Sequence, residues 1–369
     1  MSDSGVAATI RAVTERPLGF GLFDIMQLDP LAGPEVDVAA MYARRLDLLS
    51  EADKLGYAIA FAAERHFLAN YACPSATAWV AAASQRTSTM RLGVLGYTLP
   101  MRAPIQLAEE IAVLDLLTNG RLEVGFGLGH RVEELVAVGI DPAERIALFQ
   151  ERLALMQGLW TGGTVSYERG DVTAREVTIA PLPAQVPYPP LWYAGTEPVA
   201  ANWMGSRGLG LAVGFKPTAQ LVPAVSAYLA GRHTRSEATI EAEPDRVSGT
   251  VALMRAVYVA ETDQQATDEI ADDLLRLDEK YGHGGGEGSR ADRRREARER
   301  VAAMIRDDIM LAGGPETVAR AIDATRAALP FDLLLANVHG AGMDEERVAR
   351  TVRLLAEKVR PACTPVATS

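Results

Sequence analysis

The sequence predicts an α/β fold in which eight parallel strands alternate with helices. Two patterns point to it. Short apolar runs recur along the chain, as expected for parallel strands that are covered on both faces. Each run is followed by a segment with apolar residues at helical spacing. A chain of 369 residues, 48% hydrophobic and 23% charged, is typical of a globular protein. This alternation fits either a closed barrel or a doubly wound sheet.

The first half of the chain contains four strand–helix pairs. The strands are expected at residues 18–23, 57–63, 90–99 and 121–127, and the helices at 38–55, 75–85, 104–117 and 142–160. Gly56 follows the first helix and suits a C-terminal cap. The third helix has proline in its first turn and Asn119-Gly120 just past its end.

The second half continues the alternation with strands at 191–194, 210–213, 251–259 and 331–337 and a closing helix at 345–359. Residues 162–189 are expected to form a hairpin inserted before the fifth strand. Residues 282–289 hold five glycines in eight positions, which predicts a linker or a mobile lid. We therefore expect one domain over residues 17–361, with flexible tails at 1–16 and 362–369.

Charge and composition exclude several partners. The net charge of −11 argues against nucleic acid, whose phosphates would repel the chain. The arginines of residues 290–300 alternate with acidic residues, which is typical of a solvated helix face. Two distant cysteines, Cys73 and Cys363, do not make a disulfide framework. With neither a secretory leader nor an 18-residue apolar run, we expect a cytoplasmic protein without a membrane partner.

Several familiar catalytic motifs are missing from the sequence. It contains no G-x-S-x-G nucleophile elbow, no G-x-x-x-x-G-K-[ST] loop and no H-E-x-x-H zinc motif. The five histidines are scattered, with no pair at metal-ligand spacing. We therefore assign no metal site.

A charged triplet follows the second predicted strand. Glu64, Arg65 and His66 stand in consecutive positions, where functional residues gather in parallel α/β folds. A carboxylate, a guanidinium and an imidazole together would make a reactive site. The alternative is a polar strand end in which these side chains pair with their neighbours. His339, after the last strand, falls on the same face in a barrel, with an ordinary loop histidine as the alternative.

Two glycine-containing turns are candidates for anion binding. In Gly125-Phe-Gly127-Leu128-Gly129-His130-Arg131, alternate glycines allow a ligand or another backbone to approach closely. His130 occupies the position where a dinucleotide fingerprint needs glycine. In Ala194-Gly195-Thr196-Glu197-Pro198, Thr196 is a candidate helix cap and the proline suits the first turn. A helix N-terminus after glycine is a ready phosphate site. An ordinary capped helix would show the same sequence pattern.

Taken together, these segments resemble the bacterial-luciferase-like family of flavin-dependent monooxygenases, from about residue 19 to residue 361. The matching text, in order, is Ala63-Glu-Arg-His-Phe67, Arg86-Thr87, Arg91-Leu-Gly-Val94, Leu99-Pro100, Pro104-Ile-Gln-Leu-Ala-Glu109, Leu114-Asp115, Gly120-Arg121-Leu122, Gly125-Phe-Gly-Leu-Gly129, Gly314-Pro-Glu-Thr317 and Val359-Arg-Pro361. The order and spacing of these pieces are specific, although no single piece is.

The resemblance implies a (β/α)₈ TIM barrel with insertions that acts as a homodimer. It implies reduced FMN, delivered by a separate reductase and bound at the C-terminal face. There the flavin reacts with O₂ to give a C4a-(hydro)peroxyflavin that oxygenates a small organic substrate. It places Leu95, Gly96 and Tyr97 under the isoalloxazine. In the family, this segment often contains a non-proline cis peptide bond. Gly195 and Thr196 match the phosphate-binding turn, and residues 282–300 fall where the family carries a mobile lid.

Two positions depart from the family pattern. Arg65 stands where luciferases have the catalytic histidine, and arginine cannot serve as a base near pH 7 because its pKa is above about 12. It can instead steer an anionic substrate or stabilise a flavin peroxide. Leu128 stands where many relatives place an arginine on the flavin phosphate, so we expect His130 or Arg131 to supply that charge.

The catalytic candidates are therefore His66, Arg65 and Glu64, with Gly127, Leu128, Gly129, His130 and Arg131 beside the flavin. Two alternatives remain: hydride transfer with the deazaflavin F420 on the same barrel, and a non-catalytic flavin-binding or partner subunit. Hydroxylation and Baeyer–Villiger oxidation fit the sequence equally well.

Overall fold

The eight predicted strands form one closed parallel barrel. The computed structural model describes residues 13, 16–28, 37–129, 131–169, 172–235, 251–281, 289–340 and 344–363. Around the barrel, the strands follow the order β1 (Gly19–Asp24), β2 (Ile59–Ala62), β3 (Arg91–Thr98), β4 (Leu122–Gly127), β7 (Leu191–Ala194), β8 (Gly210–Gly214), β9 (Val251–Val259) and β11 (Leu333–Asn337). The pairings of β11 with β1 and of β8 with β9 close the ring. The prediction of a TIM barrel is confirmed, and the doubly wound sheet is excluded.

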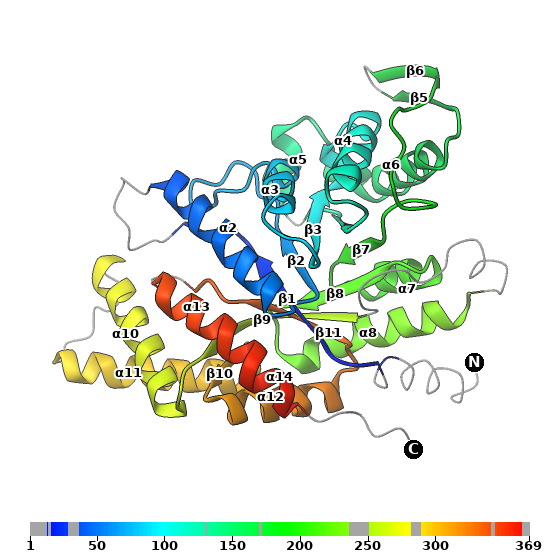
Figure 1. Ribbon diagram of the computed structural model, residues 1–369. Helices are drawn as coiled ribbons and strands as arrows, with labels where there is room; N and C mark the ends of the chain where they lie inside the picture. The colour runs from blue at the N-terminus through cyan, green and yellow to red at the C-terminus, as the bar shows by residue number, and fades with distance from the viewer. Residues whose placement is uncertain are drawn as a thin grey trace.

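Helices surround the barrel strands (Figure 1). The longer ones are α2 (Val38–Lys54), α3 (Ala76–Ser84), α4 (Pro104–Leu117), α6 (Arg145–Trp160), α7 (Pro198–Ser206), α8 (Thr218–His233), α12 (Pro315–Ala328) and α13 (Glu345–Leu354). Shorter turns are η1 (Leu99–Met101), α5 (Val132–Ala137), η2 (Pro142–Glu144), η3 (Leu355–Val359) and α14 (Arg360–Ala362). Among the described residues, no helix has the length and apolarity needed to cross a bilayer.

Side chains alternate between the barrel interior and the helix layer, as the two-residue period of a strand requires. The interior is filled by apolar residues such as Phe61, Leu95 and Trp192. At the N-terminal end of the barrel, the buried Glu123 carboxylate accepts hydrogen bonds of 2.5 Å from Trp192 Nε1 and Arg91 Nε. These contacts fill the bottom of the barrel and leave the opposite, C-terminal end for a ligand.

Two excursions leave the barrel. The first is the antiparallel hairpin of β5 (Val165–Arg169) and β6 (Val172–Val177), which projects away from the barrel at the top right of Figure 1. The second comprises α10 (Asp263–Tyr281), α11 (Arg290–Arg306) and the strand β10 (Met310–Gly313), which pairs in parallel with the last four residues of β9. The sequence did not predict β10.

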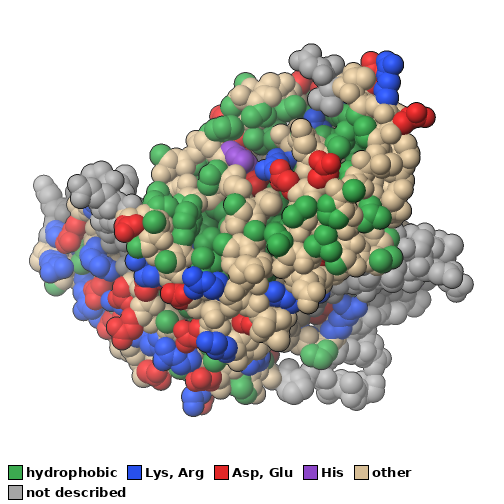
Figure 2. All heavy atoms as spheres, turned by 45° about the horizontal axis from the view of Figure 1, so that its top comes forward, with side chains coloured by type: hydrophobic (Ala, Val, Ile, Leu, Met, Phe, Trp, Pro, Cys, Tyr) green, Lys and Arg blue, Asp and Glu red, His purple; other side chains and the backbone are tan. Residues whose placement is uncertain are grey.

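The arginines of α11 are paired rather than simply solvated. Arg294 and Arg298 contact Asp272 and Asp268 on α10, each at 2.6 Å, and further arginines of the helix have acidic partners. Mixed acidic and basic side chains mark this region in the lower left of Figure 2. Residues 289–300 of the predicted lid region thus cap and begin a regular helix, whereas 282–288 lie outside the described residues.

Some residues that carry the family resemblance have a structural role. The Asp53 carboxylate accepts hydrogen bonds from Thr89 Oγ1 and from the N–H of Met90, both at 2.6 Å. Arg121 donates to the side chain of Thr87 and to the carbonyl of Met90. These contacts fix the loop between α3 and β3 on the side away from the candidate site. Thr87 and Arg121, which belong to the segments that resemble the family, therefore have a structural role here.

Candidate functional site

A cavity of about 430 Å³ opens at the C-terminal ends of the barrel strands, where active sites of such barrels lie. Seven of the eight strands or the loops that follow them contribute to its lining. The lining residues are Phe23, Arg65, Leu95, Gly96, Thr98, Gly127, Leu128, Gly129, Arg145, Tyr193, Ala194, Gly195, Thr196, Glu197, Phe215 and Met254. Most of the residues predicted for flavin contact are in this set.

The charged triplet after β2 divides between two environments. Arg65 lines the cavity. Glu64 and His66 lie together elsewhere, with His66 Nε2 3.0 Å from Glu64 Oε1, and neither lines the cavity. In an extended segment successive side chains point to opposite sides, so Arg65 points one way and its two neighbours point the other. Arg65 is therefore the member of the predicted triplet that is placed to meet a ligand.

Glu64 is the centre of a buried polar network. Only 3% of the residue is exposed, and its carboxylate accepts two hydrogen bonds of 3.3 Å from Arg102, which also contacts Glu110 at 2.8 Å. The Arg102 guanidinium lies 5.5 Å from the centroid of the Tyr97 ring. The Tyr97 hydroxyl bonds Thr77 Oγ1 at 2.8 Å. Burial raises the pKa of Tyr97, so this side chain is a neutral part of the network rather than a part of the cavity wall.

The glycines of β3 and β4 differ in how much room each leaves for a side chain. A Cβ on Gly96 would lie 2.7 Å from the carbonyl oxygen of Gly125, and a Cβ on Gly125 would lie 2.5 Å from Leu95 Cδ1. These two strands therefore pack too closely for side chains. A Cβ on Gly127 would meet nothing nearer than 4.0 Å and would project into open space. The Leu95–Gly96 peptide is cis, as the resemblance implied.

One end of the cavity carries groups that bind anions. Gly195 and Thr196 line it just before α7, and Lys216 Nζ donates to Thr196 Oγ1 at 2.9 Å. Arg145, at the start of α6, also lines it. The prediction that Thr196 caps α7 is wrong. Because α7 begins at Pro198, the cap position is Glu197, which makes no side-chain cap hydrogen bond. The first N–H groups of α7 thus keep no side-chain cap.

The predicted substitutes for the missing phosphate arginine are placed differently. Leu128 lines the cavity. Arg131 does not, and its Nε lies 3.3 Å from Glu134 Oε1. His130 lies outside the described residues. Arg145 and Lys216 were not predicted, because nothing in their local sequence distinguishes them from surface cations.

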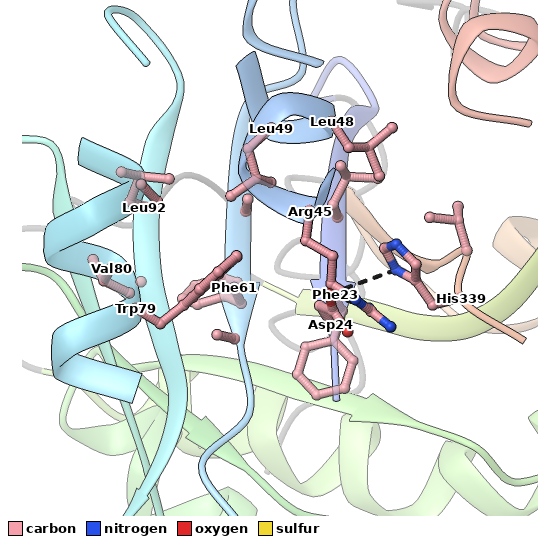
Figure 3. Close-up of a pocket in the computed structure, with 16 residues that line it drawn as sticks. Phe23, Asp24, Arg45, Leu48, Leu49, Phe61, Trp79, Val80, Leu92 and His339 are labelled. Atoms are coloured by element: carbon pink, nitrogen blue, oxygen red, sulfur yellow. Dashed lines mark hydrogen bonds and ion pairs between the residues drawn. The ribbon is translucent and has the colours of Figure 1, made fainter. Parts of the chain in front are cut away.

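His339 belongs to a separate buried cluster between the barrel and the helix layer, shown in Figure 3. Its Nδ1 lies 3.6 Å from Asp24 Oδ2, and Asp24 also pairs with Arg45 of α2. Burial lowers the pKa of His339 to about 4, against the attraction of Asp24. Burial alone would raise the pKa of Asp24, but His339 and Arg45 hold it below its usual value. A cavity of about 20 Å³ adjoins these groups.

Nothing in the described chain suggests a metal centre, since no three His, Cys, Asp or Glu side chains are grouped as ligands there. The cavity instead fits a flavin nucleotide in two respects. Gly127 leaves open space where a ring system would approach the wall. Thr196 and Arg145 line the cavity and Lys216 donates to Thr196, which supplies the hydroxyl and cationic groups that a phosphate requires, with the exposed carboxylate of Glu197 next to Thr196.

Comparison with known proteins agrees with this architecture. The family model for luciferase-like monooxygenases matches residues 19–332. The chain is 31% identical over 257 residues to the uncharacterized protein y4wF of Sinorhizobium fredii, covering 70% of this chain and 72% of that protein. It is 29% identical over 363 residues to 4-hydroxyprotoasukamycin monooxygenase of Streptomyces nodosus subsp. asukaensis, covering 93% and 92%. It is 28% identical over 177 residues to the oxygenase component of flavin-dependent trigonelline monooxygenase of Acinetobacter baylyi, covering 47% and 48%.

Solved structures share the fold. The monooxygenase RslO1 of Streptomyces bottropensis superposes with a TM-score of 0.75 at 25% identity, covering 93% of this chain and 99% of that one. The oxygenating constituent of 3,6-diketocamphane monooxygenase from Pseudomonas putida, in complex with FMN, gives 0.73 at 19% identity, covering 94% and 99%. An F420-dependent secondary alcohol dehydrogenase gives 0.68 at 18% identity, with the same coverage.

The fold and the cavity define a barrel oxidoreductase with a site for a flavin-type cofactor. The chain belongs to the luciferase-like monooxygenase family.

Proposed function

We propose that the protein is a monooxygenase that receives reduced FMN from a separate flavin reductase and uses O₂ to oxygenate a small organic substrate. The observation that carries this proposal is the cavity at the C-terminal face, with an anion-binding end formed by Thr196, Lys216 and Arg145. The trigonelline enzyme, named as an oxygenase component, supports a separate reductase. We also propose a single domain over residues 17–361.

In this proposal, the phosphate of the nucleotide lies at the N-terminus of α7. The Thr196 hydroxyl and the cations of Lys216 and Arg145 would contact it, and the helix dipole would add to the attraction. These two cations would replace the phosphate-binding arginine that many relatives have at the position of Leu128. The flat ring system would lie against Leu95–Gly96 and Gly127. When bound, reduced flavin supplies the electrons that activate O₂.

The remaining site residues act on the substrate and on the environment of the ring. Arg65 places a positive charge in the cavity. Glu64 does not reach the cavity, so we assign it and His66 a positioning role through Arg102. The apolar wall of Phe23, Phe215 and Met254 excludes water from the reacting atoms.

Two alternatives from the sequence analysis remain distinct. Hydride transfer with F420 is the first, because the fold also houses F420-dependent enzymes and F420 carries a phosphate that the same cavity end would hold. A catalytically silent partner subunit is the second. The cations Arg145 and Lys216 count against it, because they restore the charge that the departure at Leu128 removes.

An anaerobic titration with FMNH₂, followed by rapid mixing with oxygenated buffer, tests the proposal. We expect saturable binding and a transient absorbance that belongs to neither reduced nor oxidised flavin. Weak FMNH₂ binding together with tight F420 binding would replace the proposal by the F420 alternative. Binding of neither would leave the silent subunit.

We further propose that the protein is a cytoplasmic homodimer that packs through α3 and α4. Helix α4 exposes Val113, Leu116 and Leu117, and apolar side chains gather on the upper half of the molecule in Figure 2. A surface of this kind is typical of a protein interface. We expect sedimentation equilibrium at micromolar concentration to give a dimer and Leu116→Glu to give a monomer. A wild-type monomer would contradict the proposal.

A further inference from the structure

Several buried and half-buried arginines around the barrel have acidic partners, whereas Arg65 and Arg145, which both line the cavity, have none among the described residues. Arg45 pairs with Asp24, Arg91 with Glu123 and Arg102 with Glu64. The half-buried guanidinium of Arg65 makes no hydrogen bond or ion pair with any residue that the structure describes, although its side chain lines the cavity. A half-buried cation on a cavity wall without an acidic partner is available to pair with an anionic ligand.

The backbone holds Arg65 in this position. The N–H of Arg65 donates to the carbonyl of Cys73 at 2.9 Å, and the N–H of Ala63 donates to the carbonyl of Asp24 at 2.9 Å. On the other side of the chain, Glu64 is fixed by Arg102. The segment is thus tied to β1, to its own loop and to the helix layer, so the backbone from which the Arg65 side chain reaches the cavity is fixed.

The charges of the cavity separate into two places. Thr196, Lys216 and Arg145 come from β7, from the loop after β8 and from α6. Arg65 follows β2, which is three strands from β7 in the barrel order. One end is therefore available for the flavin phosphate, and the charge of Arg65 is left for another ligand. Among the described lining residues, the one carboxylate is Glu197, which is exposed and follows β7.

The surroundings of Arg65 define the rest of that ligand. Phe23 on β1, the strand adjacent to β2, lines the cavity together with Phe215 and Met254. The rings of Phe23 and Phe215 are 5.9 Å apart between centroids. A planar guanidinium matches the two oxygens of a carboxylate, and the neighbouring wall is apolar and aromatic.

We infer that the substrate is a carboxylate-bearing small molecule with an apolar or aromatic body, and that Arg65 binds its carboxylate while Phe23, Phe215 and Met254 contact the body. This inference rests on the proposed function, in that the flavin phosphate takes the other end of the cavity. It assigns to Arg65 a role in substrate selection rather than in proton transfer.

Two matched pairs of probes test the inference: benzoate against benzamide, and octanoate against octanamide. Each probe is titrated calorimetrically into the full-length protein saturated with FMN. In at least one pair we expect the acid to bind at least about tenfold tighter than the amide, the usual advantage of a charge-assisted bond. Arg65→Gln should remove that preference, and Arg65→Lys should retain part of it. Arg86→Gln, at an exposed arginine paired with Asp47, should leave it unchanged.

The same variants are titrated with FMN and with riboflavin, which lacks the phosphate. We expect Arg65→Gln to bind both within about twofold of wild type. If the variant loses affinity for FMN but not for riboflavin, Arg65 is a phosphate ligand and the inference is wrong. It is also wrong if neither pair shows an acid preference, or if the preference survives Arg65→Gln. Failure of the wild-type protein to bind reduced FMN under anaerobic conditions would instead contradict the proposed function.

Discussion

Gly127→Val is expected to weaken flavin binding by about 100-fold and to leave the fold intact. A Cβ at Gly127 meets nothing nearer than the Gly129 nitrogen at 4.0 Å, so the added side chain would stand in the cavity without displacing any part of the protein. Valine also suits the extended backbone of β4. We expect the dissociation constant for FMN, measured by fluorescence quenching, to rise by about 100-fold, since steric overlap of this kind costs about 1–3 kcal/mol. The thermal midpoint should not fall.

Gly125→Val is the matched control on the same strand. Its Cβ would lie 2.5 Å from Leu95 Cδ1 and 2.7 Å from the carbonyl oxygen of Val94, and the backbone atom cannot move without separating β3 from β4. We expect a loss of unfolding free energy of about 3 kcal/mol or more, read from urea denaturation. If Gly127→Val instead unfolds the protein, or if it binds FMN normally, the flavin does not approach β4 as proposed.

Acid is expected to destabilise the protein through His339, and His339→Asn should weaken that dependence. The pKa of His339 is about 4 in the folded chain, against about 6.5 for an unperturbed histidine. Between these values the unfolded chain binds the proton and the folded chain does not. Stability is therefore lost as the pH falls below about 6.5. From pH 7.5 to 4.5, the loss from this residue is about 2.5 kcal/mol.

The measurement is the unfolding free energy in urea at several pH values for three proteins. His339→Asn should show the shallower slope, because its side chain does not titrate. His233→Asn, at an exposed position on α8, should match wild type. Asp24 and Arg45 are the charged groups that face His339 from β1 and α2. Equal slopes for all three proteins would mean that His339 accepts its proton in the folded state as readily as in the unfolded state, through Asp24.

The barrel could be predicted because its strands are short apolar runs and its helices carry clear boundary signals such as Pro104 and Gly56. The strand β10 could not, because it lies outside the strand–helix alternation of the barrel and owes its place to pairing with β9. Tertiary contacts determine that these residues form a strand, and local sequence preferences carry no information about such contacts.

The candidate site was predicted by position along the chain, but not by the direction in which side chains point. The sequence places Glu64, Arg65 and His66 together at a strand end; the structure brings Arg65 alone to the cavity. Arg145 was missed because it reaches the cavity from α6, and Lys216 because it contacts the cavity residue Thr196 from the loop after β8. Their neighbours in sequence give no sign of this, so the residues that complete the anion-binding end required the fold.

Within the triplet after β2, two residues have structural contacts and the third lies on the cavity. Glu64 and His66 are held in a polar network with Arg102, so a change at either disturbs the support of the cavity wall. Arg65, between them, lines the cavity and makes no such contacts among the described residues. If Arg65 binds the substrate as we infer, a single codon change at residue 65 would alter substrate preference and leave the architecture as it is.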